Sequence, residues 1–297
     1  MITLAHLSDI HLAPLPSVSP FELFNKRLTG YLNWRLRRQS SLGGVGLTAL
    51  VAHLHEQAAD FTAVTGDLIN LGLNAEIVTA LAWLKDIGSP DKVCVSPGNH
   101  DAYIRGTLTR ARAAWHEYLS GETIDDNPFP FVRRIGEVAI ISCSSAISTA
   151  PFVSAGRFDL KQADRLSRIL KLLGDGGYFR TVLIHHPPTL DARNARSGLW
   201  GGKLFRQVIK DAGAEMILHG HTHRSTIHSL PGPAADVPVI GVAAAGTAQD
   251  ARATDDPARY NLFRIEKMGS AWSCTMREFG FQRLGSEITL RLQMRIY

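Results

Sequence analysis

Residues 1–12 of the chain read MITLAHLSDIHL, an apolar run that leads directly to the polar side chains of Asp9 and His11. Further short apolar runs of strand length occur at residues 61–65, 93–96, 138–142, 181–184, 216–218 and 237–242. Amphipathic stretches of helical length alternate with them, around residues 47–56, 75–85, 107–119, 161–173 and 203–212. This alternation is typical of a layered sheet with helices on its faces. The sequence therefore predicts an α/β chain.

The composition fits a folded protein with one large domain or two small ones. Of its 297 residues, 45% are hydrophobic and 20% are charged, which excludes a disordered or fibrous chain. The formal net charge of +5 suits an anionic partner without distinguishing phosphate esters, nucleic acids and lipid surfaces. Its three cysteines lie far apart and form no CxxC pair, which argues against a disulfide framework and against a thiolate zinc site.

The N-terminal sequence bears on where the protein resides. Polar Ser8 and Asp9 interrupt the first apolar stretch, and no basic segment precedes it, so we expect no secretion signal. No apolar run reaches the ~18 residues that cross a bilayer. We therefore expect a cytoplasmic location.

Side chains that can bind metals gather where the apolar runs end: Asp9, His11, Asp67, Asn99, His100, His185, His186, His221 and His223. In an open α/β sheet the ligand crevice lies beyond the carboxyl ends of the strands, so we expect these side chains to converge. The i, i+2 spacing of Asp9 with His11, and of His221 with His223, points both members of each pair to one face of an extended chain. Glycines precede Asp67, Asn99 and His221, where the missing Cβ permits a sharp turn and a close approach to a ligand.

The donor set combines carboxylate, amide and imidazole groups and contains no sulfur. Such a set suits Mn, Fe or Zn better than Ca, and its size indicates two ions. Asp67, at the centre of the predicted sheet, is placed to bridge two cations about 3.5–4 Å apart, the separation that two-metal hydrolases use. Such a pair would turn a bridging water into a hydroxide nucleophile and neutralise the oxygens of a phosphoryl group.

The ordered motifs closely resemble those of the calcineurin-like metallophosphoesterases, which carry D-x-H, GD, GNH[DE], H and GHxH blocks in this order. Here the blocks read Asp9-Ile10-His11, Gly66-Asp67, Gly98-Asn99-His100-Asp101, His185 and Gly220-His221-Thr222-His223. The resemblance implies a four-layer α/β/β/α sandwich with two mixed sheets face to face. It also implies a metal-dependent enzyme that hydrolyses a phosphodiester, phosphomonoester or pyrophosphate bond through a metal-bound hydroxide.

The resemblance assigns a role to each matching residue. Asp9, His11 and His223 would hold one metal, Asn99, His185 and His221 the other, and Asp67 would bridge the two. His100 would be catalytic without binding metal, either stabilising the transition state or protonating the leaving oxygen. Asp101 would orient an imidazole from outside the metal shell. Adjacent residues at a strand end point to opposite faces, and the ligand of this family is usually the first of such a pair, which favours His185 over His186.

The pattern changes beyond the last motif. A polar stretch at residues 247–259 precedes three strand-like segments, at residues 261–265, 271–277 and 287–297. We expect a catalytic domain of residues 1–250 and an antiparallel β appendix, residues 251–297, packed on it. Because an exposed edge strand invites pairing, residues 287–297 also predict a homodimer.

Residues 20–39, PFELFNKRLTGYLNWRLRRQ, interleave apolar and aromatic side chains with five basic ones and a single acid. Two interpretations stay open. An interfacial helix would bury the apolar side chains in lipid, holding the protein at the inner face of the membrane. An ordinary helix would instead pack them on the domain. The first favours a lipid-linked pyrophosphate substrate of the UDP-diacylglucosamine type, and the second a cyclic nucleotide or small diester.

Three further alternatives concern binding. The chain lacks the dense basic patches of a sequence-specific nucleic-acid reader. A non-catalytic metal-binding scaffold of the same fold would be expected to lose ligands or His100, and none is missing. The connection at residues 187–202 follows a ligand-bearing strand and is either part of a substrate rim or a solvated loop.

Overall fold

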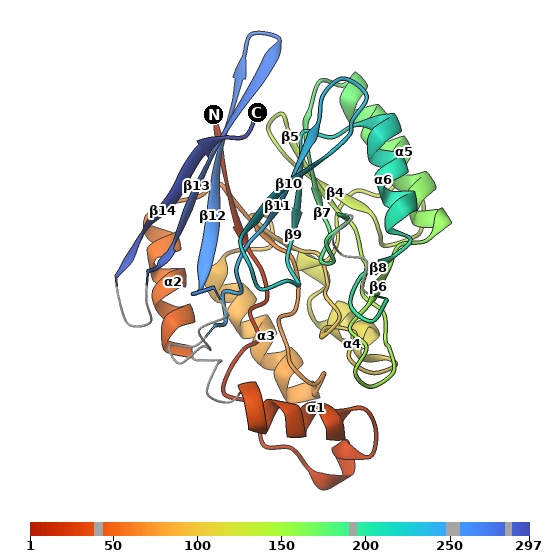
Figure 1. Ribbon diagram of the computed structural model, residues 1–297, viewed down its shortest axis with the longest axis vertical. Coiled ribbons are helices and arrows are strands. Elements are labelled where there is room, and N and C mark those ends of the chain that lie inside the picture. The colour runs from red at the N-terminus through yellow and green to blue at the C-terminus, as the bar shows by residue number, and fades with distance from the viewer. Residues whose placement is uncertain (39–43, 190–194, 248–255, 283–286) are drawn as a thin grey trace.

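The computed structural model describes residues 1–38, 44–189, 195–247, 256–282 and 287–297. Two six-stranded mixed sheets face each other, with α2 and α3 outside the first sheet and α5 and α6 outside the second (Figure 1). The predicted four-layer α/β/β/α sandwich is confirmed. The helices are α1 (Arg27–Asn33), α2 (Gly44–Glu56), α3 (Asn74–Ile87), α4 (Thr107–Ala114), α5 (Leu160–Asp175) and α6 (Gly202–Ala212).

The first sheet has the order β14-β13-β12-β1-β2-β3. Its strands are β1 (Ile2–Leu7), β2 (Phe61–Val64), β3 (Val93–Val95), β12 (Arg259–Met268), β13 (Ala271–Phe281) and β14 (Ile288–Arg295). β1, β2 and β3 run parallel to one another, and their side chains are almost all buried. Parallel strands covered on both faces are expected to be apolar throughout, as these are.

The second sheet has the order β10-β11-β9-β7-β5-β4. Its strands are β4 (Phe131–Ile135), β5 (Val138–Ser142), β7 (Phe179–Leu183), β9 (Met216–His219), β10 (Thr226–Leu230) and β11 (Val237–Gly241). β5, β7, β9 and β11 are parallel, and antiparallel β4 and β10 close the two edges. A small pair, β6 (Gly156–Arg157) with β8 (Leu199–Trp200), lies outside both sheets.

The outer helices pack through apolar stripes at helical spacing. In α5 the buried residues Ala163, Leu166, Ile169 and Leu170 recur every three or four positions. The carboxylate of Asp159 begins this helix by accepting the Gln162 N–H at 2.9 Å. One continuous core includes α2, α3 and the inner faces of both sheets, which fixes the sheets against each other.

The C-terminal strands are antiparallel, as predicted, and they extend the first sheet. β12 pairs with β1 with Leu4 opposite Phe263, and β13 and β14 follow outward. The physical reason is that β12 satisfies the open backbone edge of β1 and buries apolar side chains in the shared core. The predicted boundary at residue 250 lies outside the described residues, so the division into 1–250 and 251–297 stays a prediction.

Residues 20–38 do not form one amphipathic helix. They divide into a 3-10 turn, η1 (Pro20–Leu23), helix α1, and a π turn, η2 (Trp34–Arg38). Asn25 makes the break, because its side chain accepts the Arg27 N–H at 2.9 Å and donates to the Glu22 carbonyl. No helix in the described ranges is long and apolar enough to cross a membrane.

Candidate metal centre

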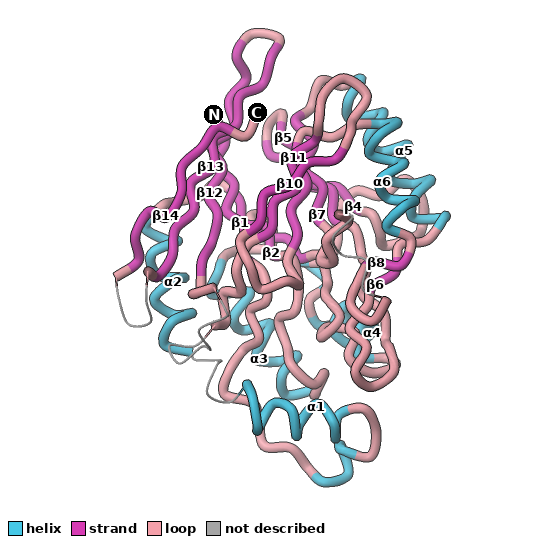
Figure 2. Tube along the Cα trace, in the orientation of Figure 1, coloured by secondary structure: helices cyan, strands magenta, loops and turns pink. Residues whose placement is uncertain are grey.

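The predicted ligands lie on loops that leave the strands at their carboxyl ends, where the two sheets meet (Figure 2). Because β1 and β2 are parallel neighbours, the loops after them run side by side. The Asp9 N–H donates to the Gly66 carbonyl at 3.0 Å, and the His11 N–H donates to the Asp67 carbonyl at 2.9 Å. The space is tight, since a Cβ at Gly98 would lie 2.2 Å from Asp67 Oδ1.

Asp9, His11 and His223 form one cluster, with ligand atoms within 4.8 Å of one another. Asp9 Oδ1 lies 3.2 Å from His223 Nε2 and 4.0 Å from His11 Nε2. Asp9 and His11 are buried, and His223 is partly exposed. These are the three residues that the resemblance assigns to one ion.

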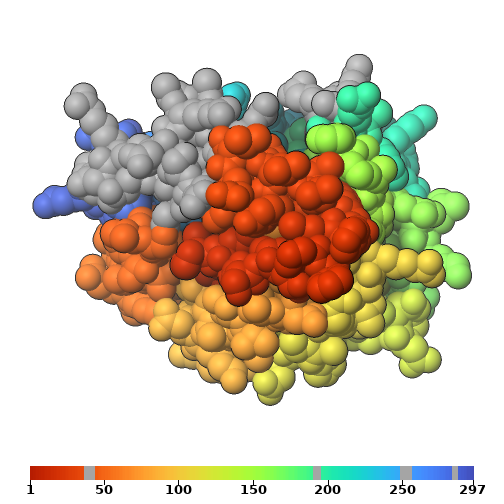
Figure 3. All heavy atoms as spheres, turned by 90° about the horizontal axis from the view of Figure 1, so that it is seen from below, coloured from red at the N-terminus to blue at the C-terminus, as the bar shows by residue number. Residues whose placement is uncertain are grey.

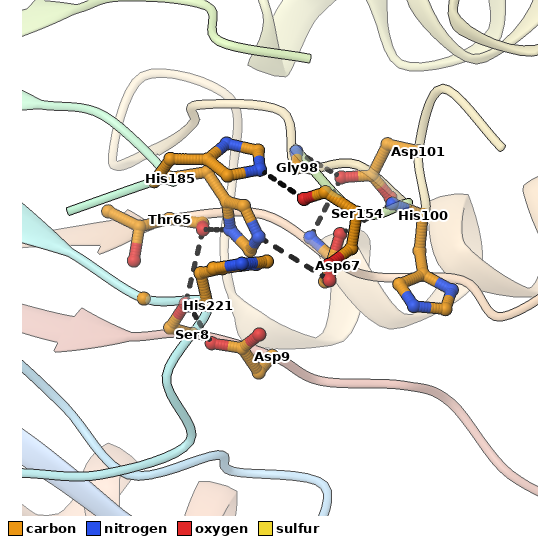
Figure 4. Close-up of polar contacts among 12 residues, drawn as sticks. Ser8, Asp9, Thr65, Asp67, Gly98, His100, Asp101, Ser154, His185 and His221 are labelled. Atoms are coloured by element: carbon orange, nitrogen blue, oxygen red, sulfur yellow. Dashed lines mark hydrogen bonds and ion pairs between the residues drawn. The ribbon is translucent and has the colours of Figure 1, made fainter. Parts of the chain in front are cut away.

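Asp67 lies between His11 of this cluster and His185, a predicted ligand of the second ion. Its Oδ2 is 3.8 Å from His11 Nε2 and 3.4 Å from His185 Nε2 (Figure 4). Asp9, Asp67 and His185 also offer ligand atoms within 4.8 Å of one another. A carboxylate in this position faces both sets of donors, as a bridging ligand must.

His185 and His186 differ in what their ring nitrogens contact. His185 Nδ1 donates to the Thr65 carbonyl at 2.6 Å, because a carbonyl can only accept, and Nε2 is then directed at Asp67. Both nitrogens of His186 are used, Nδ1 by the Ser145 hydroxyl at 2.7 Å and Nε2 by the Ser154 carbonyl at 2.9 Å. His186 does share a group of possible ligand atoms with His185 and His221, all within 4.8 Å of one another. His185 is favoured as the ligand, because its Nδ1 is fixed by an outer hydrogen bond while its Nε2 has no hydrogen bond.

The remaining predicted ligands are His221 and Asn99, and the His221 ring centroid lies 5.2 Å from that of His185. The His221 N–H donates to Asp9 Oδ2 at 2.9 Å, and its Nε2 donates to the Ser197 carbonyl at 2.9 Å, which leaves Nδ1 as its ligand atom. Asn99 Oδ1 is buried without a hydrogen-bond partner among the described residues, and His185 Nε2 has the ion-pair contact with Asp67 but no hydrogen bond. Such atoms cost stability unless another group binds them. The donor set therefore fits divalent transition-metal ions.

Asp101 contacts the loop backbone. Its Oδ2 accepts the N–H groups of Asp67 at 2.9 Å and Gly98 at 2.8 Å, and its Oδ1 accepts that of Leu68 at 3.0 Å. The resemblance implies that Asp101 orients an imidazole. The structure corrects that partner, because the turns after β2 and β3 present three N–H groups that a buried carboxylate satisfies together. Asp101 positions Asp67 through the main chain.

His100 lies at the rim of the cluster. Its N–H donates to Asp67 Oδ1 at 2.7 Å, and its Nδ1 donates to the Asn70 carbonyl at 2.6 Å. The ring stacks on Tyr103 with centroids 5.4 Å apart. Asn99 and His100 both line a cavity of about 560 Å³ that opens next to the cluster.

Burial and mutual charge set the protonation of the centre. Burial alone would raise the pKa of Asp67, but the imidazoles of His185 and His100 hold it well below its usual range. For His185, burial opposes the charge of Asp67, which prevails and raises the pKa to about 9. Burial lowers the pKa of His221 to about 4. Protons and cations therefore compete for these carboxylates and imidazoles.

Lys26, which belongs to none of the motifs, lines the same cavity. Its Nζ donates to Thr149 Oγ1 at 2.9 Å and to the Val153 carbonyl at 3.2 Å, and it lies 4.8 Å from the centroid of the Tyr103 ring. In the sequence Lys26 is one of five basic residues in 20–39, and no pattern marks it as the one that turns inward.

Comparisons with known proteins agree with this geometry. The model of the family described as calcineurin-like phosphoesterase matches residues 2–225. A dimetal phosphatase from Danio rerio has 12% identity and a TM-score of 0.62, covering 100% of this chain and 99% of its own. The purple acid phosphatase PPD1 from yellow lupin (Lupinus luteus) has 9% identity and a TM-score of 0.58; the match covers 99% of this chain and 53% of the lupin protein. The two structures share the fold, and no curated protein matches the sequence.

Proposed function

The chain belongs to the calcineurin-like phosphoesterase family, and from this premise we propose that it hydrolyses a phosphodiester, phosphomonoester or pyrophosphate bond at a pair of Mn, Fe or Zn ions. The family makes it a metal-dependent phosphoester hydrolase with a phosphate-ester substrate. The observation that supports the proposal most is the meeting of candidate ligands from separate strand-end loops in one buried cluster.

The proposal gives each ligand its place. Asp9, His11 and His223 would hold one ion, Asn99, His185 and His221 the other, and Asp67 would bridge. When bound, the ions would supply an activated water and neutralise the phosphoryl oxygens.

The cavity supplies the other groups. His100 is fixed through Nδ1 by the Asn70 carbonyl, so its Nε2 would donate a hydrogen bond or a proton to the leaving oxygen. The ammonium group of Lys26 would attract the anionic substrate into the same cavity.

The test removes ligands singly. Asp67→Ala and His221→Ala should each lower Mn-dependent hydrolysis of bis-p-nitrophenyl phosphate by about 100-fold or more, because each removes a direct ligand. Mn content after dialysis should fall in the same variants. His116→Ala, at an exposed histidine outside the motifs, is the matched control. Hydrolysis that survives both ligand substitutions would defeat the proposal.

The non-catalytic scaffold is disfavoured, because every ligand position and His100 is present. A homodimer through β14 stays a prediction, and so does the cytoplasmic location. β14 is the outer strand of the described sheet, and most of its side chains are exposed.

A further inference from the structure

Residues 20–38, called the cap below, have two of their basic side chains turned inward. The Arg27 guanidinium is 8% exposed and donates to the carbonyls of Leu71, at 3.0 Å, and Gly72. The Lys26 ammonium group donates to Thr149 and to the carbonyl of Val153, and Val153 also lines the cavity. A surface helix of a globular protein normally buries apolar side chains and exposes its charges. In the cap two cations hydrogen-bond to the body, and Tyr31 adds an apolar contact with the cluster of Leu71, Leu73 and Tyr103.

Five large apolar side chains of the cap are exposed to solvent. The fractions are 83% for Phe21, 82% for Phe24, 47% for Leu28, 50% for Leu32 and 80% for Leu36. The cap spreads over one end of the molecule, where Figure 3 shows it in red and orange. Exposed apolar surface concentrated in one segment marks an interaction site more often than scattered single residues do.

This surface continues into the cavity beside the metal centre. Leu32, Trp34 and Leu36 line one side of the cavity, and Phe152 and Val153 line it from another loop. Phe152 is 81% exposed and has a φ of 63°, a conformation that bulky residues rarely adopt.

The other lining groups are polar and include Asn99, His100 and Lys26. Trp34 Nε1 is buried without a hydrogen-bond partner in the part of the chain that the structure describes. The cavity thus joins polar groups next to the metal centre to an apolar rim that opens to solvent.

We propose that the substrate is an amphiphilic phosphoester taken from a lipid surface. Its phosphate would lie at His100 and Lys26, and its hydrocarbon chain would lie along Leu32, Leu36 and Phe152. This rests on the proposed function, because the phosphate must reach the metal centre. A hydrophilic ester would leave the apolar rim of the cavity in contact with water, whereas a hydrocarbon chain would bury that rim.

The charge and position of the cap favour a lipid surface over a protein partner. A protein seated on Leu32 and Leu36 would cover the mouth of the cavity through which substrate enters. A bilayer offers the substrate at that mouth. The exposed Arg35 and the net charge of +5 complement anionic lipids.

Chain length of the substrate tests the groove. The probes are p-nitrophenyl methyl phosphate and p-nitrophenyl dodecyl phosphate, used below the micelle concentration with the Mn-loaded protein. We expect kcat/KM for the dodecyl ester to exceed that for the methyl ester by at least about tenfold. Leu32→Ser with Leu36→Ser should bring the ratio toward one. Val78→Ser with Leu172→Ser, which changes two exposed apolar side chains on other helices, should leave the ratio as it is.

Vesicle flotation tests the surface without catalysis. Metal-free protein should float with phosphatidylglycerol–phosphatidylcholine vesicles and less with phosphatidylcholine alone, and Phe21→Ser with Phe24→Ser should remove binding to both. The Val78 and Leu172 variant should float like the wild type. Light scattering on the same proteins, without vesicles, measures their molecular mass. A lower mass for the Phe21 and Phe24 variant than for the wild type and the control variant would identify a second copy of the chain as the occupant.

The results separate the two proposals. The lipid substrate is overturned if the wild type hydrolyses the dodecyl and methyl esters with a kcat/KM ratio near one. It is also overturned if the Phe21 and Phe24 substitutions leave flotation unchanged, or if they lower the molecular mass measured by light scattering. Absence of hydrolysis of both esters, with normal Mn content, would instead overturn phosphodiester hydrolysis, while flotation would still decide whether the cap binds lipid.

Discussion

Five candidate ligands share an unusual backbone conformation: Asp9, His11, Asp67, His221 and His223 all have φ between 43° and 69°. Residues other than glycine avoid this left-handed region, and each such residue costs about 1 kcal/mol or more. The conformation turns the chain sharply at the strand ends and brings neighbouring side chains toward one centre. Strain repeated at these positions indicates a site whose geometry is held against local preference.

His185 and His186 provide a paired test of ligand identity. His185→Ala should lose Mn after dialysis, because its Nε2 is the nitrogen directed at Asp67. His186→Ala should keep its Mn, since both of its nitrogens are bonded to Ser145 and Ser154. Metal analysis by mass spectrometry of both variants measures this, and the assignment is wrong if His186→Ala is the one depleted.

Asp101 should contribute to stability through the backbone. Asp101→Asn replaces one acceptor oxygen by a donor facing an N–H group, so the free energy of unfolding should fall by about 1–3 kcal/mol. Asp159→Asn is the matched control, because Asp159 caps α5 and asparagine caps a helix equally well. Urea denaturation of the metal-free proteins compares them. Equal losses in the two variants would contradict the role given to Asp101.

The elements differ in how well the sequence predicts them. β1, β2 and α5 were foreseen because buried strands and amphipathic helices carry strong local patterns. The motifs likewise located the candidate ligands that the structure brings together, since each motif follows a strand. The sequence does not predict the division of the cap at Asn25 or the partial burial of the Lys26 side chain. Both depend on contacts that the local pattern does not encode, such as the one between Lys26 and Thr149. The pairing of β12 with β1 is equally nonlocal, and no sequence pattern in either segment indicates its partner.

The place of β12 in the first sheet predicts how truncations behave. Removal of residues 257–297 would expose the edge of β1 and take Leu262 and Phe263 out of the shared core. We expect this variant to lose cooperative thermal unfolding by circular dichroism. Removal of residues 287–297 alone takes away only mostly exposed side chains and should leave a cooperative transition. A cooperative transition after the longer deletion would favour an independent domain ending near residue 250.

The packing of the two sheets also buries imidazoles throughout the molecule, which makes its stability depend on pH. His6 is fully buried on β1 with its Nε2 2.9 Å from Thr65 Oγ1, and burial, with a smaller effect from the charge of His219, lowers its pKa to about 3. In the unfolded chain the pKa of this group returns to about 6.5. Between these values the unfolded state binds the extra proton, so the free energy of unfolding falls as the pH falls.

For the whole protein this predicts a measurable slope. The contribution of His6 should reach about 1.4 kcal/mol per pH unit below pH 6.5, and it should fade as the pH approaches 3, where the folded protein also takes up the proton. Urea denaturation of the metal-free protein at a series of pH values measures the slope. His6→Gln should flatten it by about one proton, whereas His116→Gln, at an exposed position, should follow the wild type. Parallel curves for His6→Gln and wild type would mean that His6 is already protonated in the folded state, and burial would then not be the cause of the acid sensitivity.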